Sequence, residues 1–186
     1  MKTRIICLLF TSSLFIISCK NEPKQTSPTT SSKTVQPTGQ SGVKDDVSNP
    51  NIVQVASGSP DHTTLVAAVK AADLVDALSN TGPFTVYAPT NAAFEKLPKG
   101  TVEGLLEPSK KADLQAILEY HTYVGVLKTA YLSDGQEFEQ VSGQKITITL
   151  RDGKTYVNGT AEIVASIPTS NGIIHVINEV LLPPSK

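Results

Sequence analysis

The side chains with the widest chemical range in this sequence are three histidines, His62, His121 and His175. Three imidazoles are enough to hold a metal ion, but their spacings contain no HxxxH or HxH arrangement that would present two ligands together. His121 falls on the apolar stripe of a predicted helix, and His175 alternates with Ile173 and Ile177 on one face of a predicted strand. We therefore predict that His121 and His175 are buried and hydrogen-bonded, that His62 is exposed before a helix, and that no metal is bound.

The remaining titratable and nucleophilic side chains follow no catalytic pattern. Four glutamates fall on different predicted turns rather than as a facing pair of carboxylates: Glu95, Glu103, Glu107 and Glu119. The sequence contains no G-x-S-x-G turn, no Walker phosphate loop and no dinucleotide-binding fingerprint. We predict a protein that is not an enzyme and has no cofactor.

Both cysteines lie among the first nineteen residues. Lys2 and Arg4 precede a mostly apolar run over residues 5–17, which is shorter than the roughly 20 residues of a spanning helix and matches an export signal. The run ends in Ile-Ile-Ser-Cys, which resembles the lipobox of bacterial prolipoproteins, where the cysteine sulfur carries a diacylglycerol. The resemblance predicts a signal peptide over residues 1–18 and lipidation of Cys19. The alternative is an ordinary cleaved signal with a chance cysteine near its end.

Residues 20–48 are rich in Ser, Thr, Pro and Gln, and their only apolar residues are three valines. Such a composition buries too little to offset the entropy of ordering, so residues 19–48 are predicted to be a lipidated cysteine followed by a disordered tether. Its flexible reach is about 30 Å. We expect attachment to a membrane through the lipid, in the bacterial envelope. Lys20 stands where an Asp retains some lipoproteins in the inner membrane, which favours the outer membrane.

Composition excludes one further class of partner. Sixteen basic residues stand against seventeen acidic ones, and the net charge is −1. A binder of nucleic acid needs a clustered excess of Lys and Arg, so no nucleic-acid partner is expected. Aromatic residues make up 5% of the chain and Trp is absent, which leaves few rings for stacking on bases or sugars.

From residue 49 the pattern becomes that of a folded domain. Helices are predicted from residue 61 or 63 to 72, over 75–78, from a cap at Asn91 to 97, and from 109 to 121. Strands are predicted over 84–88, 146–150, 156–157, 161–165 and 173–182, with hairpin turns at Asp152-Gly153 and Asn158-Gly159. Asp73 is predicted to break the first helix. Helices packed on antiparallel strands indicate one α+β domain over residues 49–184.

Two segments resemble the paired signature boxes of fasciclin-like domains. The first is FTVYAPTNAAF, residues 84–94, with Thr90, Asn91 and Phe94; the second is NGIIHVIN, residues 171–178, with Asn171, Gly172 and His175. Between them, ILEYH at residues 117–121 is similar to the family's tyrosine–histidine segment. The resemblance implies a layer of short helices packed on an antiparallel β wedge or sandwich.

In animal members of that family, the tyrosine–histidine segment and an Asp-Ile pair before the second box are linked to integrin binding. By position these correspond to Tyr120 and His121, and to Ser166 and Ile167. Ser166 replaces the acidic residue, so integrin-type recognition is not inherited. If Tyr120 lies near the surface, its ring is a candidate contact, while His121 fixes the local backbone.

These observations predict a lipid-anchored, non-catalytic interaction module that binds a protein or polysaccharide of the cell surface or matrix. The alternative is an envelope receptor that holds a small apolar or glycan ligand in a pocket between helices and sheet. An enclosed apolar pocket above about 300 Å³ would favour the receptor.

Overall fold

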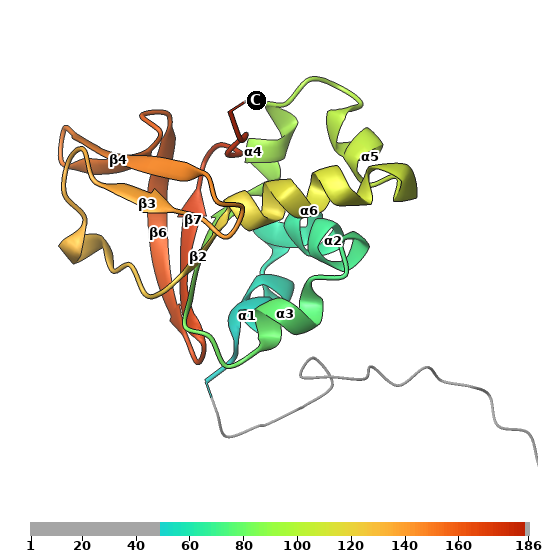
Figure 1. Cartoon of the computed structure of the whole chain (residues 1–186), viewed down its shortest axis with the longest axis horizontal. Helices are drawn as coiled ribbons and strands as arrows, with labels where there is room; N and C mark the ends of the chain where they lie inside the picture. Colours follow the sequence, from blue (N-terminus) through green and yellow to red (C-terminus); the bar gives the residue numbers. More distant parts are fainter. Residues whose placement is uncertain (1–48, 185–186) are drawn as a thin grey trace, which may run out of the picture. The chain divides into compact units, whose positions relative to one another are not determined.

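The computed structural model describes residues 49–184. The predicted signal peptide over residues 1–18, the lipidation site Cys19 and the tether lie outside the described residues, and the expectations placed on them stay predictions. Within the described part, helices gather on one side of a sheet, as the α+β prediction requires (Figure 1).

The first half of the domain is mainly helical. It contains α1 (Ile52–Gly58), α2 (Thr63–Ala71), α3 (Val75–Ser79), α4 (Asn91–Glu95), α5 (Thr101–Leu105) and α6 (Lys111–Tyr120). Short 3₁₀ turns join them at η2 (Pro60–His62) and η3 (Pro108–Lys110), and a third, η4 (Thr129–Tyr131), follows α6. Asp73 has φ 56°, so the predicted break after α2 is confirmed. The Asn51 and Gln54 side chains form a capping box that begins α1.

The seven strands are β1 (Phe84–Pro89), β2 (Thr122–Val124), β3 (Glu137–Glu139), β4 (Lys145–Arg151), β5 (Lys154–Val157), β6 (Ala161–Thr169) and β7 (Gly172–Ile177). They form one sheet in the order β2-β1-β7-β6-β5-β4-β3. Five of the neighbouring pairs are antiparallel, but β1 and β7 run parallel from Phe84 opposite Gly172 to Pro89 opposite Ile177. The sheet is therefore mixed: the expected antiparallel arrangement holds for five pairs and is wrong for β1 and β7.

The parallel pair β1 and β7 is stable inside this sheet because both of its faces are covered. Val86 and Ala88 of β1, with Ile174 and Val176 of β7, pack against the helices in one core cluster. Tyr87 and Ile177 point the other way, into a second cluster enclosed by the remaining strands. β7 ends at Ile177, earlier than predicted, and an irregular segment follows it.

The two predicted hairpin turns are confirmed by their backbone angles. Asp152 and Gly153 have φ of 53° and 72°, and Asn158 and Gly159 have φ of 53° and 73°. The sheet curves so far that its two edge strands nearly meet. The Val141 N–H, just after β3, donates to the Thr122 carbonyl of β2 at 2.9 Å.

Candidate functional site

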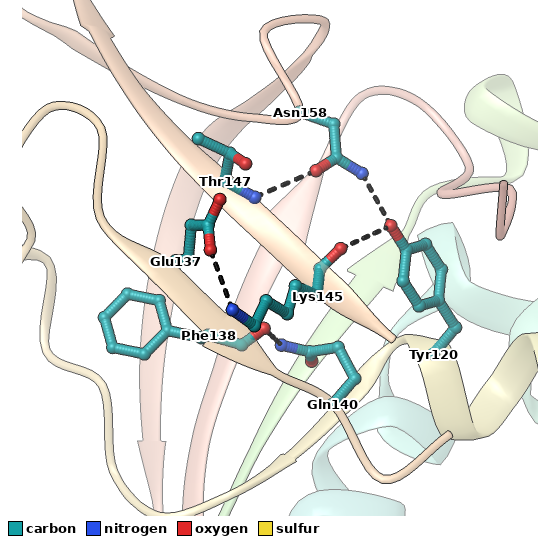
Figure 2. A network of polar contacts seen from close by, with 7 residues as sticks. All are labelled: Tyr120, Glu137, Phe138, Gln140, Lys145, Thr147 and Asn158. Atoms are coloured by element: carbon teal, nitrogen blue, oxygen red, sulfur yellow. Dashed lines mark hydrogen bonds and ion pairs between the residues drawn. The ribbon is translucent and has the colours of Figure 1, made fainter. Parts of the chain in front are cut away.

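Tyr120 ends α6 and points into the protein rather than to its surface. Tyr120 is 2% exposed, and its hydroxyl donates to the Lys145 carbonyl at 3.1 Å. The Asn158 amide donates to the Tyr120 hydroxyl oxygen at 3.0 Å (Figure 2). The condition on which we expected a contact role for Tyr120 is therefore not met. The ring lies in the second core cluster, so Tyr120 joins α6 to the strands.

Asn158 supplies the other half of this connection. Its side-chain oxygen accepts from the Thr147 N–H at 3.0 Å, and its residue has the left-handed backbone of the turn after β5 (Figure 2). Nearby, the Lys145 ammonium pairs with the Glu137 carboxylate at 3.0 Å across β3 and β4. The sequence indicated a turn at Asn158, but no sequence signal pointed to its bond with Tyr120.

His121, directly after α6, uses both of its ring nitrogens on backbone groups. Nδ1 donates to the Ile117 carbonyl at 2.8 Å, and Nε2 accepts from the Leu181 N–H at 3.0 Å. The neutral ring with its proton on Nδ1 satisfies both bonds. Burial lowers the pKa of His121 to about 4, which keeps this form at neutral pH. The prediction of a buried, hydrogen-bonded His121 is confirmed; its role is to hold the segment after β7 against α6.

His175 is fully buried on β7 and connects three other segments. Nε2 donates to the Leu127 carbonyl at 2.6 Å, and Nδ1 lies 2.8 Å from the Ser166 hydroxyl of β6. Its ring is tilted against Tyr87 at 5.5 Å between centroids. Burial lowers the pKa of His175, so the ring is neutral and accepts from Ser166. The predicted burial of His175 is confirmed.

The Ser166–His175 pair has the spacing of a nucleophile and its base, and its surroundings argue for a structural role. Neither residue lines any of the cavities described below. The second nitrogen of His175 is held by a backbone carbonyl rather than by a carboxylate. Ser166 thus replaces the expected acidic residue with a neutral hydroxyl that serves the fold.

Asn171 and Gly172 of the second box stand at the turn between β6 and β7. The Asn171 amide donates to the Leu78 and Asn80 carbonyls at 2.8 and 2.7 Å, and its oxygen accepts from the Ile52 N–H at 3.0 Å. Gly172 has φ 154°, and a Cβ there would lie 1.9 Å from the Phe84 carbonyl oxygen. Both residues therefore join the ends of α1 and α3 to β1 and β7.

The first box makes a similar junction, with one difference from the prediction. Thr90, not Asn91, caps α4, because its hydroxyl accepts from the Ala93 N–H. Asn91 instead reaches α2: its oxygen accepts from the Thr64 N–H at 3.0 Å, and its amide donates to the Pro60 carbonyl at 2.9 Å. Phe94 packs against the helical core cluster.

His62 is 6% exposed, so the prediction that it is exposed was wrong. The turn η2 folds its ring inward, where Nδ1 lies 2.9 Å from the Ser59 hydroxyl and where burial lowers its pKa. Ile167, the remaining candidate contact, is 36% exposed on β6 and lines a cavity of about 20 Å³ together with His62. Of the candidate binding residues, Ile167 alone reaches the surface to this extent; Tyr120 and His121 are both 2% exposed.

Two apolar cavities among the helices of the described domain are small. One cavity of about 30 Å³ lies among α1, α2, α3 and β1, and another of about 30 Å³ lies among α4, α5 and α6. Each is about the size of one water molecule and far below the roughly 300 Å³ that a small ligand needs. A larger space of about 300 Å³ between α1 and α2 is an open surface depression. These volumes disfavour the alternative of a ligand receptor.

Residues 49–184 lack two further features. Within them, no three His, Cys, Asp or Glu side chains come together in a way that would hold a metal ion. Likewise, none of the described helices has both the length and the hydropathy needed to cross a membrane.

The fold and these junctions define a class of protein: a small α+β scaffold in which two sequence boxes form adjacent parallel strands and their polar side chains fix the surrounding elements. A model of the Fasciclin domain family matches residues 60–183. The chain therefore belongs to the fasciclin domain family.

The relatives include bacterial and animal proteins. The protein sll1483 of Synechocystis is 53% identical over 72% of this chain and 73% of its own length, and sll1735 of the same organism is 44% identical over 72% and 98%. Human periostin is 36% identical over 67% of this chain, but the match covers only 15% of periostin. In fold, the chain is similar to a FAS1 domain pair from the insect cell adhesion molecule Fasciclin I, with a TM-score of 0.63 at 19% identity over 72% of this chain and 51% of that one.

Proposed function

We propose that this protein is a membrane-attached binding module of the bacterial envelope, which contacts a protein or polysaccharide of the cell surface or matrix and catalyses no reaction. The observation that carries the proposal is the use of its polar side chains. His121, His175, Asn158 and Asn171 each spend their hydrogen-bonding atoms on groups of the same domain. Groups engaged in this way are not free to act on a substrate.

The proposed attachment rests on the sequence. Lipidation of Cys19 and the tether that follows would place the domain about 30 Å from its anchor, at the outer membrane. Many copies held on one surface raise the effective concentration of the domain, so that weak individual contacts are sufficient for adhesion.

The named relatives support adhesion as the kind of activity. The domain pair of similar fold comes from an insect cell adhesion molecule. This chain must nevertheless contact its partner through residues other than those linked to integrin binding in the animal members, because Tyr120 is buried and Ser166 replaces the acidic residue. We therefore propose a partner in the cell surface or matrix without transferring integrin recognition.

The test is a deletion of residues 49–184 that keeps residues 1–48 in place. Attachment of cells to each other and to a matrix should fall, and biofilm mass should fall with it, at matched surface amounts of the two proteins. Unchanged attachment and biofilm would overturn the proposal. A small molecule that co-purifies with the domain in stoichiometric amount would instead support the receptor.

A further inference from the structure

Four segments meet at the end of the domain where the chain enters it: residues 49–53, 80–85, 122–128 and 167–173. We call this the entry end. The Ser170 N–H donates to the Pro50 carbonyl at 3.1 Å, and the Gly125 N–H donates to the Pro83 carbonyl at 2.9 Å. Phe84 joins the two pairs, because its N–H donates to the Asn171 carbonyl at 3.0 Å. The four segments are therefore neighbours in space.

The entry end has unusually few charged residues for this protein. Its four segments contain no acidic residue and a single basic one, Lys128, although charged residues make up 18% of the chain. Apart from Lys128, the exposed positions carry amide, hydroxyl, proline and aliphatic groups, among them Asn49, Thr81, Pro168 and Ser170. Contact with an apolar medium therefore strips water from no carboxylate there.

Aliphatic side chains are also exposed in these four segments. Val124 is 63% exposed, Val126 is 45% exposed and Ile167 is 36% exposed. These are three of the eight large hydrophobic residues that stand exposed in the described domain. Transfer of such side chains from water to the boundary between lipid headgroups and acyl chains is favourable.

From this placement we propose that the entry end is a lipid-docking surface, on which Val124 and Val126 rest against the membrane that carries the anchor. A lipid surface is favoured over a protein partner because the chain's predicted anchored segment joins the domain at this end, at Asn49. Docking deepens the proposed attachment and rests on it. It also turns the opposite end, where α4 and the described C-terminus lie, away from the membrane and toward a partner (Figure 1).

The test uses the chain from Cys19 to Lys186, with the Cys19 thiol coupled to a maleimide lipid in vesicles of phosphatidylethanolamine and phosphatidylglycerol. Because the protein contains no Trp, Val126→Trp introduces a single Trp at the entry end, whose emission is excited selectively over that of the five tyrosines. Val164→Trp is the matched control, since Val164 is 52% exposed on β6 outside the entry end. Circular dichroism first verifies that both variants are folded.

The emission of the Val126→Trp variant should shift to the blue, and brominated lipid should quench it about twofold more than that of the Val164→Trp variant. Adding Val124→Asp to Val126→Trp should abolish the difference. Equal quenching of the two reporters, or none at either, would overturn the proposal. A blue shift that grows with protein concentration without vesicles would also overturn it, in favour of a second copy on this surface. Because coupling imposes the attachment and no partner is present, these results do not depend on the outcome of the deletion test.

Discussion

Single polar residues in this domain connect, through hydrogen bonds, segments that are distant in sequence. Asn171 holds α1 and α3 to the start of β7, His121 holds the segment after β7 to α6, and Tyr120 holds α6 to β4. In each case a buried donor or acceptor finds a backbone partner, which avoids the cost of stranding it. Removing one partner should therefore cost more than the net value of the bond.

Tyr120→Phe should lower the free energy of unfolding by about 1–2 kcal/mol, because the Asn158 amide loses its acceptor and the Lys145 carbonyl loses a donor. Urea denaturation measures the change. Tyr131→Phe is the control, since Tyr131 is 75% exposed and its substitution should be nearly neutral. Equal effects of the two substitutions would contradict the role assigned to the Tyr120 hydroxyl.

Acid should destabilise the domain through His121. Its pKa is near 4 when folded and near 6.5 when unfolded, so the unfolded chain binds more protons between these values and stability falls as the pH drops from 6.5 to about 4. The loss amounts to about 3 kcal/mol for this residue.

Across that pH range, the free energy of unfolding should depend less steeply on pH for His121→Gln than for the wild type. A residual slope is expected in the variant, because burial also lowers the pKa values of His62 and His175. An identical pH dependence in the two proteins would rule out His121 as the main source.

The sequence predicted some of these buried polar residues and missed others. Periodicity placed His121 and His175 in the core, because alternation and helical stripes record which face is buried. The same reasoning failed for His62 and did not find the Tyr120–Asn158 bond. Both depend on how a turn is oriented in three dimensions, and this orientation leaves no period in the sequence.

Among the elements, β1 and β7 are packed tightly where β7 begins, with no room for a Cβ on Gly172. Gly172→Ala should destabilise the domain by about 3 kcal/mol or more, since the added methyl group meets the Phe84 carbonyl and φ is positive. Gly104→Ala in α5 is the matched control, with open space around the new methyl group. It should stabilise the domain by about 0.5–1 kcal/mol, because Ala is the better helix former.

Thermal melting distinguishes the two glycine variants by the sign of the shift in Tm. A Gly172→Ala protein as stable as the wild type would mean that β1 and β7 do not pack as closely as described here.

Local signals predicted most helices, the two hairpins and the break at Asp73, because caps, turn residues and periodicity act within a few residues. They did not predict that β1 and β7 run parallel. Their pairing joins the two signature boxes, which are far apart in the sequence. The apolar residues of both strands are compatible with parallel and with antiparallel pairing.

At the scale of the whole molecule, the anchor remains the central prediction. The mature protein should begin at Cys19 with its sulfur and amine acylated, and it should partition into detergent. Mass spectrometry of the mature N-terminus tests this, and Cys19→Ala should release the protein or leave it unprocessed. An unmodified Cys19, or cleavage elsewhere, would contradict the prediction.

The parallel pairing of β1 with β7 also has a consequence for folding kinetics. β1 cannot pair with β7 until this last strand has been synthesised, and closing so long a loop is slow compared with forming hairpins such as β4–β5. A ribosome-bound chain that lacks β7 should thus stay sensitive to protease even after every helix has emerged. Cooperative folding begins only when the second box arrives, so the domain tolerates truncation at its C-terminal strand poorly.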